Sequence, residues 1–352
     1  MGLKSLELSG FRCFEHAELR PSAGINLVTG KNASGKTSLL EAIFLLGRGR
    51  SFRAARREKM IREGSDQLRV VGQADDGRFI GIEASQDGWI ARAGGESVTQ
   101  LAQLADFLAI QLIDPEIHRL VQEGPGERRR FLDWATFHVK HEFLSTWRNY
   151  QRALRQRNAA LKAAAPDSTL EAWEISLAKE GERLDRFRAE TLAMLQEPVN
   201  SVAQYLLDQE IHLQYRAGHA SGQDLAEALA SHRGRDRKMG ATQVGPHRAD
   251  VEVALGPHRA RGWVSRGQQK MVAAAMVLGQ ARVLAPLWGD RGILLVDDPG
   301  AELDQERSAK LVELIAEMPF QVFVTALDKK ALAGLEPAAR FHVEQEKIHP
   351  VV

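Results

Sequence analysis

The chain has a single cysteine, Cys13, among its 352 residues. One cysteine cannot form an internal disulfide or supply a cysteine-rich metal cluster, so disulfide-stapled secreted folds are excluded and a reducing compartment is indicated. Long hydrophobic runs are also missing, because the longest one, residues 271–279, is far too short to cross a bilayer. The first residues contain no apolar segment of signal-peptide length. We therefore expect a cytoplasmic protein with no membrane partner.

A strong excess of one charge is missing as well. Lysine and arginine total 47 against 46 aspartate and glutamate, and this near balance argues against a uniformly basic nucleic-acid binder. The basic residues are nevertheless clustered, at residues 48–59, 128–130 and 233–238. Each cluster alone is equally consistent with a solvated surface, but three of them in a near-neutral chain favour contact with a phosphate backbone.

The most informative stretch is Gly30-Lys31-Asn32-Ala33-Ser34-Gly35-Lys36-Thr37, which fits the phosphate-loop pattern Gly-x-x-x-x-Gly-Lys-Thr without a mismatch. An apolar run, residues 25–28, precedes it, and a helical pattern over residues 38–46 follows it. A strand that enters a glycine-rich turn and then a helix points successive backbone N–H groups at one spot, where a di- or triphosphate can bind. A chance glycine-rich turn is the alternative, and the register of strand, helix, lysine and threonine disfavours it.

Two side chains of this loop are expected to carry chemistry. Lys36 reaches the terminal phosphates as a positive charge and acts in catalysis, and the hydroxyl of Thr37 is a ligand of Mg²⁺. The predicted nucleotide-binding residues of this region are Gly30, Lys31, Asn32, Ala33, Ser34, Gly35, Lys36, Thr37 and Ser38.

The segments around the loop predict a mixed α/β domain. Residues 4–9 and 24–30 are typical of strands, and residues 36–47 are typical of a helix. Three alternating runs then predict an antiparallel β layer, with Asp75-Asp76-Gly77 as a hairpin turn between the first two. These runs cover residues 67–74, 78–84 and 88–93.

The middle of the chain changes to a helical hydrophobic period. Large apolar residues recur at helical spacing over residues 143–161 and 170–195, and the pattern breaks at residues 165–168. We predict an inserted antiparallel helical hairpin whose arms, of about 25 residues, are each roughly 37 Å long. Ser168, with Glu171 three residues later, is predicted to start the second helix as a capping box.

The last third returns to an α/β pattern. Two alternating runs and two runs that are apolar throughout predict four strands, and we expect them to complete the sheet of the phosphate loop. They cover residues 210–216, 249–255, 292–296 and 320–325. The predicted domains are 1–112 and 209–352 for the two parts of the nucleotide-binding head and 113–208 for the inserted helical arm.

Two further segments are candidates for the rest of the site. Asp297 and Asp298 end a buried run, where the first can hold Mg²⁺ through its water shell and the second can orient or deprotonate an attacking water. Acids often end strands, so only the phosphate loop makes this pair significant. Ser265 precedes a helical run and is predicted to form a capping box with Gln268, while Gly267 beside them allows the same helix start to bind an anion.

The order of these motifs resembles a known family. Gly30–Thr37, Ser265–Gln268, Leu294–Asp298 and Ala301–Asp304 look like the successive motifs of the ABC-type ATPase heads of SMC and recombination proteins. Several longer stretches look like the RecF family of bacterial DNA replication and repair proteins. They are residues 46–53, 129–134, 155–161, 245–250 and the Ser265 segment. The resemblance covers nearly the whole chain, from Leu6 to about Val343.

The resemblance implies a fold and a mechanism. The fold is an α/β, ABC-type P-loop ATPase head, in which a mixed sheet with an antiparallel β subdomain carries an inserted α-helical hairpin arm. Two heads dimerise around two ATP molecules with Mg²⁺, so that each ATP lies on one phosphate loop and is capped by Ser265 of the partner subunit. Gly267 and Gln268 bind with the serine, and Asp304 lies in the loop that crosses the dimer interface. Gln111 takes the glutamine role at the metal that links the nucleotide to the arm.

The chain also departs from the family pattern. Ala33 stands where glycine is usual, at a cost of about 1 kcal/mol if that position needs a positive φ. Asp298 is one methylene shorter than the usual glutamate, Pro299 follows it directly, and Thr325-Ala326-Leu327 contains no switch histidine. These features predict slow hydrolysis, as in a weak DNA-dependent ATPase used as a switch. Arg12 is expected either near the nucleotide or simply on the surface.

The implied function is ATP-dependent DNA binding in recombinational repair and replication restart. The implied partners are single-stranded, double-stranded and gapped DNA, RecR and RecO-type mediators, and a second copy of the chain, with RecA loading as the outcome. The alternative is the ATP-binding subunit of an ABC transporter, in which the insert between Thr37 and Ser265 is much shorter. A third reading, an SMC-like tether, needs a longer arm with sustained heptads.

Overall fold

The computed structural model describes residues 2–300, 304–327, 332 and 334–351 of the chain. The chain divides into two compact units. Unit 1 comprises Met1–Ile117 with Ala285–Val352, and unit 2 comprises His118–Leu284. Each unit has its own core of buried hydrophobic residues.

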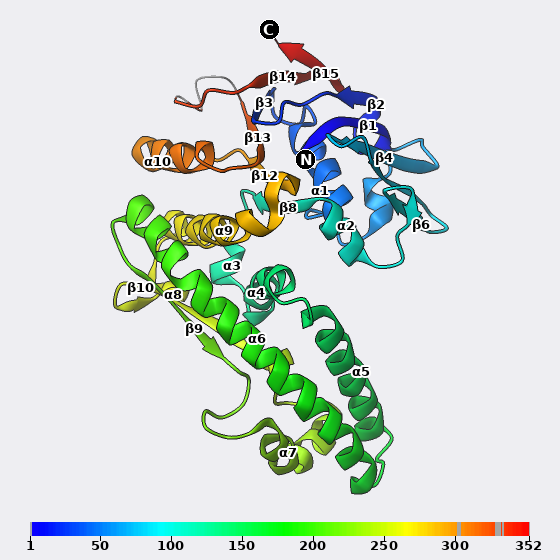
Figure 1. The fold of residues 1–352 in the computed structure, drawn as a ribbon, viewed down its shortest axis with the longest axis vertical. Helices are drawn as coiled ribbons and strands as arrows, with labels where there is room; N and C mark the ends of the chain where they lie inside the picture. The colour runs from blue at the N-terminus through cyan, green and yellow to red at the C-terminus, as the bar shows by residue number, and fades with distance from the viewer. Residues whose placement is uncertain (1, 301–303, 328–331, 333, 352) are drawn as a thin grey trace. The chain divides into compact units, whose positions relative to one another are not determined.

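Unit 1 is built on two sheets (Figure 1). Its strands are β1 (Leu3–Phe11), β2 (Phe14–Leu19), β3 (Ile25–Thr29), β4 (Gln67–Ala74), β5 (Phe79–Ser85), β6 (Trp89–Ala93), β7 (Glu96–Ser97), β8 (Ala109–Ile113), β12 (Gly292–Asp297), β13 (Gln321–Ala326), β14 (Ala339–Glu344) and β15 (Lys347–Val351). The first sheet has the order β2-β1-β4-β5-β6-β7 and is antiparallel. The second has the order β15-β14-β3-β13-β12-β8 and is parallel except for its edge strand β15.

The helix that follows the phosphate loop packs against both sheets of unit 1. Leu39, Leu40 and Ile43 of this helix are fully buried in the same core as residues of both sheets. Burying such side chains anchors the helix by the hydrophobic effect, and its first turn is held at the end of β3. The helical elements of unit 1 are α1 (Lys36–Arg48), α2 (Leu101–Phe107), α10 (Gln305–Ala316), η1 (Arg57–Met60) and η3 (Gly289–Arg291).

The predicted antiparallel layer is confirmed. Strands β4 and β5 form a hairpin in which Gln73 pairs with Phe79 across the turn. Gly77 in that turn has a φ of 85°, a conformation that glycine adopts without strain. The two runs that are apolar throughout, now β12 and β13, do enter the sheet of the phosphate loop, as predicted.

Unit 2 is mainly helical. Its elements are α3 (Arg119–Gln122), α4 (Pro125–Val139), α5 (Phe143–Lys162), α6 (Asp167–Leu207), β9 (Ile211–Arg216), α7 (Leu225–Met239), η2 (Pro246–Arg248), β10 (Asp250–Leu255), β11 (His258–Arg259), α8 (Ala260–Trp263) and α9 (Arg266–Trp288), whose last turn belongs to unit 1. Helices α5 and α6 pack side by side as the predicted antiparallel hairpin (Figure 1). Its seam includes Tyr150, Leu154 and Leu177, all buried.

The two arms are less equal than predicted. Helix α5 has 20 residues, whereas α6 has 41 and continues through Pro198, so at 1.5 Å per residue α6 is roughly 60 Å long. The predicted capping box at Ser168 is wrong. Pro166 is the N-cap of α6, and no side chain caps the helix. Glu171 instead accepts a hydrogen bond at 3.0 Å from Arg233 of α7.

The predicted boundary at residue 208 differs from the observed division, because residues 209–284 belong to unit 2 with the helices. The expectation that both alternating runs join the phosphate-loop sheet is wrong. Those runs, β9 and β10, form a separate sheet with the order β11-β10-β9. Gln196 of α6 bonds to β9, donating to the Ile211 carbonyl and accepting from the Leu213 N–H, each at 2.8 Å. An alternating strand suits such a sheet because one of its faces stays exposed.

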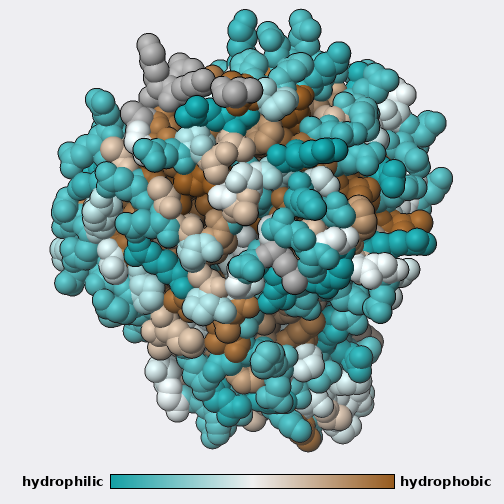
Figure 2. Space-filling model, turned by 45° about the horizontal axis from the view of Figure 1, so that its top comes forward, coloured by the Kyte–Doolittle hydropathy of each residue, from teal (hydrophilic) through white to brown (hydrophobic). Residues whose placement is uncertain are grey.

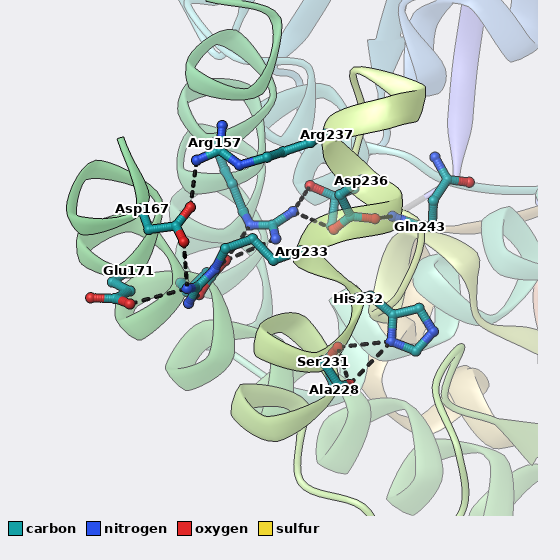
Figure 3. A network of polar contacts seen from close by, with 12 residues as sticks. Arg157, Asp167, Glu171, Ala228, Ser231, His232, Arg233, Asp236, Arg237 and Gln243 are labelled. Atoms are coloured by element: carbon teal, nitrogen blue, oxygen red, sulfur yellow. Dashed lines mark hydrogen bonds and ion pairs between the residues drawn. The ribbon is translucent and has the colours of Figure 1, made fainter. Parts of the chain in front are cut away.

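A network of charged side chains joins α5, α6 and α7 (Figure 3). Arg157, which is fully buried, donates to Glu174 at 2.9 Å and to Asp236 at 2.7 Å. Arg233 also donates to Glu174, at 2.7 Å, and Arg237 bonds Asp167. These contacts fasten α7 to the end of the hairpin where α5 turns into α6, because each cation links two or more helices.

Helix α9 is longer than its apolar run suggested. The segment Arg266–Arg291 is long and apolar enough to cross a membrane by length and composition alone. However, most of its apolar stretch is buried inside the protein, as in the core helix of a globular fold. Hydrophilic side chains cover most of the face drawn in Figure 2, and the hydrophobic ones form scattered patches there.

Candidate nucleotide-binding site

The phosphate loop connects the end of β3 to the start of α1. Gly30 and Gly35 have φ values of 155° and 115°. A Cβ on Gly30 would lie 2.4 Å from the Val343 carbonyl oxygen, and one on Gly35 would lie 2.9 Å from Cys13 Sγ, so neither position has room for a side chain. Gly35 is the N-cap of α1, no side chain caps the helix, and its first turn contains no acid. The N–H groups and the positive end of the helix dipole are thus available to an anion.

Ala33 adopts a left-handed backbone conformation, which glycine adopts without strain. Its φ is 61°, in the left-handed region. This confirms the condition under which the substitution was expected to be costly, since a residue with a Cβ loses roughly 1–2 kcal/mol there. Lys31, Asn32 and Ala33 are exposed at the tip of the loop, where an adjustment of the backbone is possible without disturbing the core.

Lys36 is folded back over the loop. Its Nζ donates to the carbonyl oxygens of Gly30 at 2.7 Å and Lys31 at 2.9 Å, and the residue is 8% exposed. Burial lowers the pKa of Lys36, and the nearby carboxylates of Asp298 and Asp297 oppose that shift. The ammonium group therefore lies between the loop and the two acids, as a lysine that contacts terminal phosphates must.

The acids at the end of β12 meet the phosphate loop, as predicted. Thr37 Oγ1 donates to Asp297, at 2.9 Å from Oδ2 and 3.1 Å from Oδ1. Asp298, the next residue, has a φ of 50°. Sequence reasoning missed Thr325, whose Oγ1 donates to Asp297 Oδ1 at 2.6 Å and accepts from the Asp298 N–H at 3.0 Å. The available signal was its place at the end of a second buried strand.

These residues fit a polyphosphate with a magnesium ion. The hydroxyl oxygen of Ser34 is buried and, within the described part of the chain, has no hydrogen-bond partner, so it can serve a phosphate. Thr37 and Asp297 offer hard oxygen ligands. No three His, Cys, Asp or Glu side chains of the described residues gather into a metal site. Mg²⁺ usually takes one or two protein ligands and completes its shell with water and phosphate.

The structure does not bring Gln111 to this pair. Gln111 lies within β8 and pairs with Leu294 of β12, three residues before Asp297. Residues level in adjacent strands point to the same face, and successive residues alternate, so Gln111 and Asp297 face opposite sides of the sheet. Its place as a metal ligand has no support in this arrangement.

Arg12 is held by α1 and has a structural role there. Its guanidinium donates to both carboxylate oxygens of Glu41, at 2.8 and 2.6 Å, and to the Lys59 carbonyl oxygen at 2.6 Å. Glu41 is fully buried and also accepts from Ser51. The carboxylate therefore ties the segment after α1 to the helix of the phosphate loop, and sequence reasoning gave no signal for it.

The predicted capping box of α9 is confirmed. The Ser265 N–H donates to Gln268 Oε1 at 3.0 Å, and the Gln268 N–H donates to Ser265 Oγ at 3.3 Å. Ser265 is exposed, and its hydroxyl proton remains available to donate. Asp304 is the N-cap of α10 and accepts from the Arg307 N–H at 2.9 Å. Residues 301–303, the rest of that motif, lie outside the described residues.

Two of the three basic clusters are engaged in part within the protein. In residues 128–130, Arg128 makes a bidentate pair with Asp250 at 2.8 and 3.0 Å, and Arg129 donates to the Ala249 carbonyl at 2.6 Å. In residues 233–238, Arg233 and Arg237 belong to the network of Figure 3. The third cluster, residues 48–59, is mostly exposed.

The fold and the Thr37–Asp297 pair define an ABC-type P-loop ATPase head. The family described as "RecF/RecN/SMC N terminal domain" matches residues 2–349. The Smc head domain of Pyrococcus furiosus shares the fold, with a TM-score of 0.62, 16% identity, and coverage of 99% of this chain and 95% of that one.

A more specific family follows from closer relatives. The chain is 40% identical to the DNA replication and repair protein RecF of Stenotrophomonas maltophilia, over 99% of both chains. It is also 40% identical to the same protein of Thioalkalivibrio sulfidiphilus, over 98% of both chains. The solved structure of "the recombination mediator protein RecF-ATP in RecFOR pathway" has a TM-score of 0.89 and 25% identity, with 99% of this chain and 97% of that chain covered. The chain belongs to the RecF family.

Proposed function

We propose that this protein binds ATP with Mg²⁺ and uses it to control its dimerisation on DNA during recombinational repair and replication restart. The observation that carries the proposal is the meeting of Lys36 and Thr37 with Asp297 and Asp298, inside a chain that belongs to the RecF family. A RecF relative with this fold has been solved with ATP, which supports the choice of nucleotide.

The residues divide the work at the bound nucleotide. Lys36 and the N–H groups of α1 hold the phosphates, and Thr37 and Asp297 hold the metal. Bound Mg²⁺ neutralises charge that develops on the transferred phosphoryl group. Asp298 orients the attacking water and accepts its proton. Because aspartate is short and no switch histidine follows β13, hydrolysis is slow, and the protein works as a switch.

The site of one chain is completed by a second copy. Ser265, with Gly267 and Gln268 behind it, starts a helix whose N-terminal dipole suits an anion, and its hydroxyl is exposed. We assign its contact to the γ-phosphate on the partner's phosphate loop. The loop that carries Asp304 crosses the same interface. ATP is thus the bridge of the dimer, and its hydrolysis releases the two copies.

Residues 48–59 are the cluster that we assign to the DNA backbone, because most of this segment is exposed. Arg56 and Lys59 in this segment are exposed. The segment is tied to α1 through Glu41, so it is fastened to the helix of the nucleotide site. The expected partners in the cytoplasm are single-stranded, double-stranded and gapped DNA, with RecO and RecR as mediators of RecA loading.

The alternative, an ATP-binding subunit of an ABC transporter, is not favoured. RecF proteins match this chain over nearly its full length, including all of unit 2. Co-purification of this protein with a membrane protein would favour the transporter alternative.

The test is to measure oligomeric state and binding to gapped, single-stranded and double-stranded DNA with ATP, with ADP and without nucleotide. The proposal expects an ATP-dependent dimer and DNA affinity that falls about 10³–10⁵-fold between 50 and 200 mM salt. Neutralising Arg56 and Lys59 together is expected to reduce the slope of log affinity against log salt by about 2 for each bound chain. The matched control, Arg235→Ala with Lys238→Ala, removes the two exposed charges of the 233–238 cluster and should leave the slope unchanged. A nearly salt-independent affinity would contradict the proposal.

A further inference from the structure

Thr325 lies at the carboxyl end of β13, between the phosphate-loop strand and the strand of the two acids. It is level with Val28 of β3 on one side and with Asp297 of β12 on the other. The residue is fully buried. A side chain in this place stands inside the sheet, beside the acids that the proposed mechanism uses.

One hydroxyl group serves both acids. Thr325 Oγ1 donates its proton to Asp297 Oδ1 at 2.6 Å and accepts from the Asp298 N–H at 3.0 Å. A hydroxyl has one proton to donate and lone pairs to accept with, so both bonds form at the same time. With Oδ1 held by Thr325, Oδ2 is the oxygen of Asp297 that lies nearer to Thr37, at 2.9 Å.

The backbone of Asp298 needs this support. Its φ of 50° is in the left-handed region, which is uncommon for residues other than glycine. It also precedes Pro299, and a proline drives the residue before it toward an extended conformation. A conformation that is unfavourable on two counts persists only where its surroundings enforce it. The bond from the Asp298 N–H to Thr325 is such a constraint, and it fixes the backbone from which the Asp298 side chain extends.

We infer that Thr325 is a positioning residue, which orients Asp297 toward the metal and Asp298 toward the attacking water. The inference rests on the proposed function. A buried hydroxyl on the strand between the loop and the acids holds the carboxylate of Asp297 and the backbone of Asp298 in place before ATP arrives. No switch histidine follows this strand in the chain.

The test separates the hydroxyl from the shape of the side chain. Thr325→Val removes the hydroxyl and keeps the branched shape, whereas Thr325→Ser keeps the hydroxyl. Binding of a fluorescent ATP analogue is measured first in EDTA and then with increasing Mg²⁺. In EDTA, we expect Thr325→Val to bind the analogue with the affinity of the parent. With Mg²⁺, we expect it to need at least about tenfold more of the ion to reach half of the change in affinity that Mg²⁺ produces. Thr325→Ser is expected to stay within about twofold of the parent.

Two results would overturn the inference. One is a Thr325→Val protein with the magnesium midpoint of the parent, and the other is a Thr325→Ser protein shifted as far as Thr325→Val. If circular dichroism shows that Thr325→Val does not fold, Thr325→Ala takes its place with the same expectation. A parent protein that binds no ATP contradicts the proposed function itself, so the two failures are distinguishable.

Discussion

Replacing Ala33 by glycine is expected to stabilise the protein although it removes a side chain. Ala33 has a φ of 61°, and relief of a left-handed alanine returns about 1–2 kcal/mol. Glycine also lowers the free energy of unfolding by about 0.4–1 kcal/mol, because it makes the unfolded chain more flexible. The net gain in the free energy of unfolding is therefore about 0–1.6 kcal/mol, centred on about 0.8 kcal/mol. Since Ala33 is exposed at the loop tip, no loss of buried contacts opposes this gain.

The assay is urea unfolding without nucleotide, followed by circular dichroism, in which a gain appears as a higher midpoint at unchanged slope. Ala164→Gly is the matched control, because Ala164 has a φ of 52° in the turn between α5 and α6, which belongs to unit 2. Both variants are expected to gain stability, and Ala33→Gly is expected to keep ATP affinity within about threefold of the parent. A gain in Ala164→Gly but a loss in Ala33→Gly would refute the assignment of strain to the loop.

Three further predictions concern unit 2 and hydrolysis. Arg157→Met leaves the buried Asp236 without its cation, so the free energy of unfolding in urea is expected to fall by about 3–5 kcal/mol. An unchanged urea midpoint would show that the network does not stabilise the fold. Burial raises the pKa of Asp185 to about 7, so the parent is expected to lose stability as pH rises from about 4 through 7. The asparagine of Asp185→Asn does not titrate in this range, so the free energy of unfolding of that variant should not decline between about pH 4 and 7. Parallel pH profiles of the parent and the variant would contradict the argument. Asp298→Asn is expected to bind ATP but to stop hydrolysis, so ATP-driven dimers persist in sedimentation, and dimers that dissociate at the parental rate would refute its role.

The local parts of the site could be predicted from sequence because their geometry comes from adjacent residues. The loop from Gly30 to Thr37 lies between a strand and a helix that its own sequence specifies. The capping box of Ser265 and Gln268 is local in the same way. The runs that are apolar throughout also predicted buried strands correctly.

The remaining parts depend on pairing between distant segments. Thr325 reaches Asp297 only because β13 lies next to β12 in the sheet, and no spacing along the chain encodes that order. The face of Gln111 likewise depends on its register with β12. Glu171 could cap its helix by spacing alone, but Arg233 from α7 competes for its carboxylate. For the same reason, the basic cluster of Arg233 could not be recognised as internally paired before its acids were placed.

The central claim, that ATP bound on one chain is capped by Ser265 of the partner subunit, is tested most directly by mixing two variants. Lys36→Met is expected to bind no ATP, and Ser265→Arg is expected to bind ATP without dimerising. In an equal mixture, one copy supplies the phosphate loop and the other supplies the serine, so one complete site can form. Sedimentation with Mg²⁺ and ATP should therefore show monomers for each variant alone and a heterodimer with one bound ATP for the mixture. A normal ATP-dependent dimer of Ser265→Arg alone, or a mixture that stays monomeric, would contradict the account.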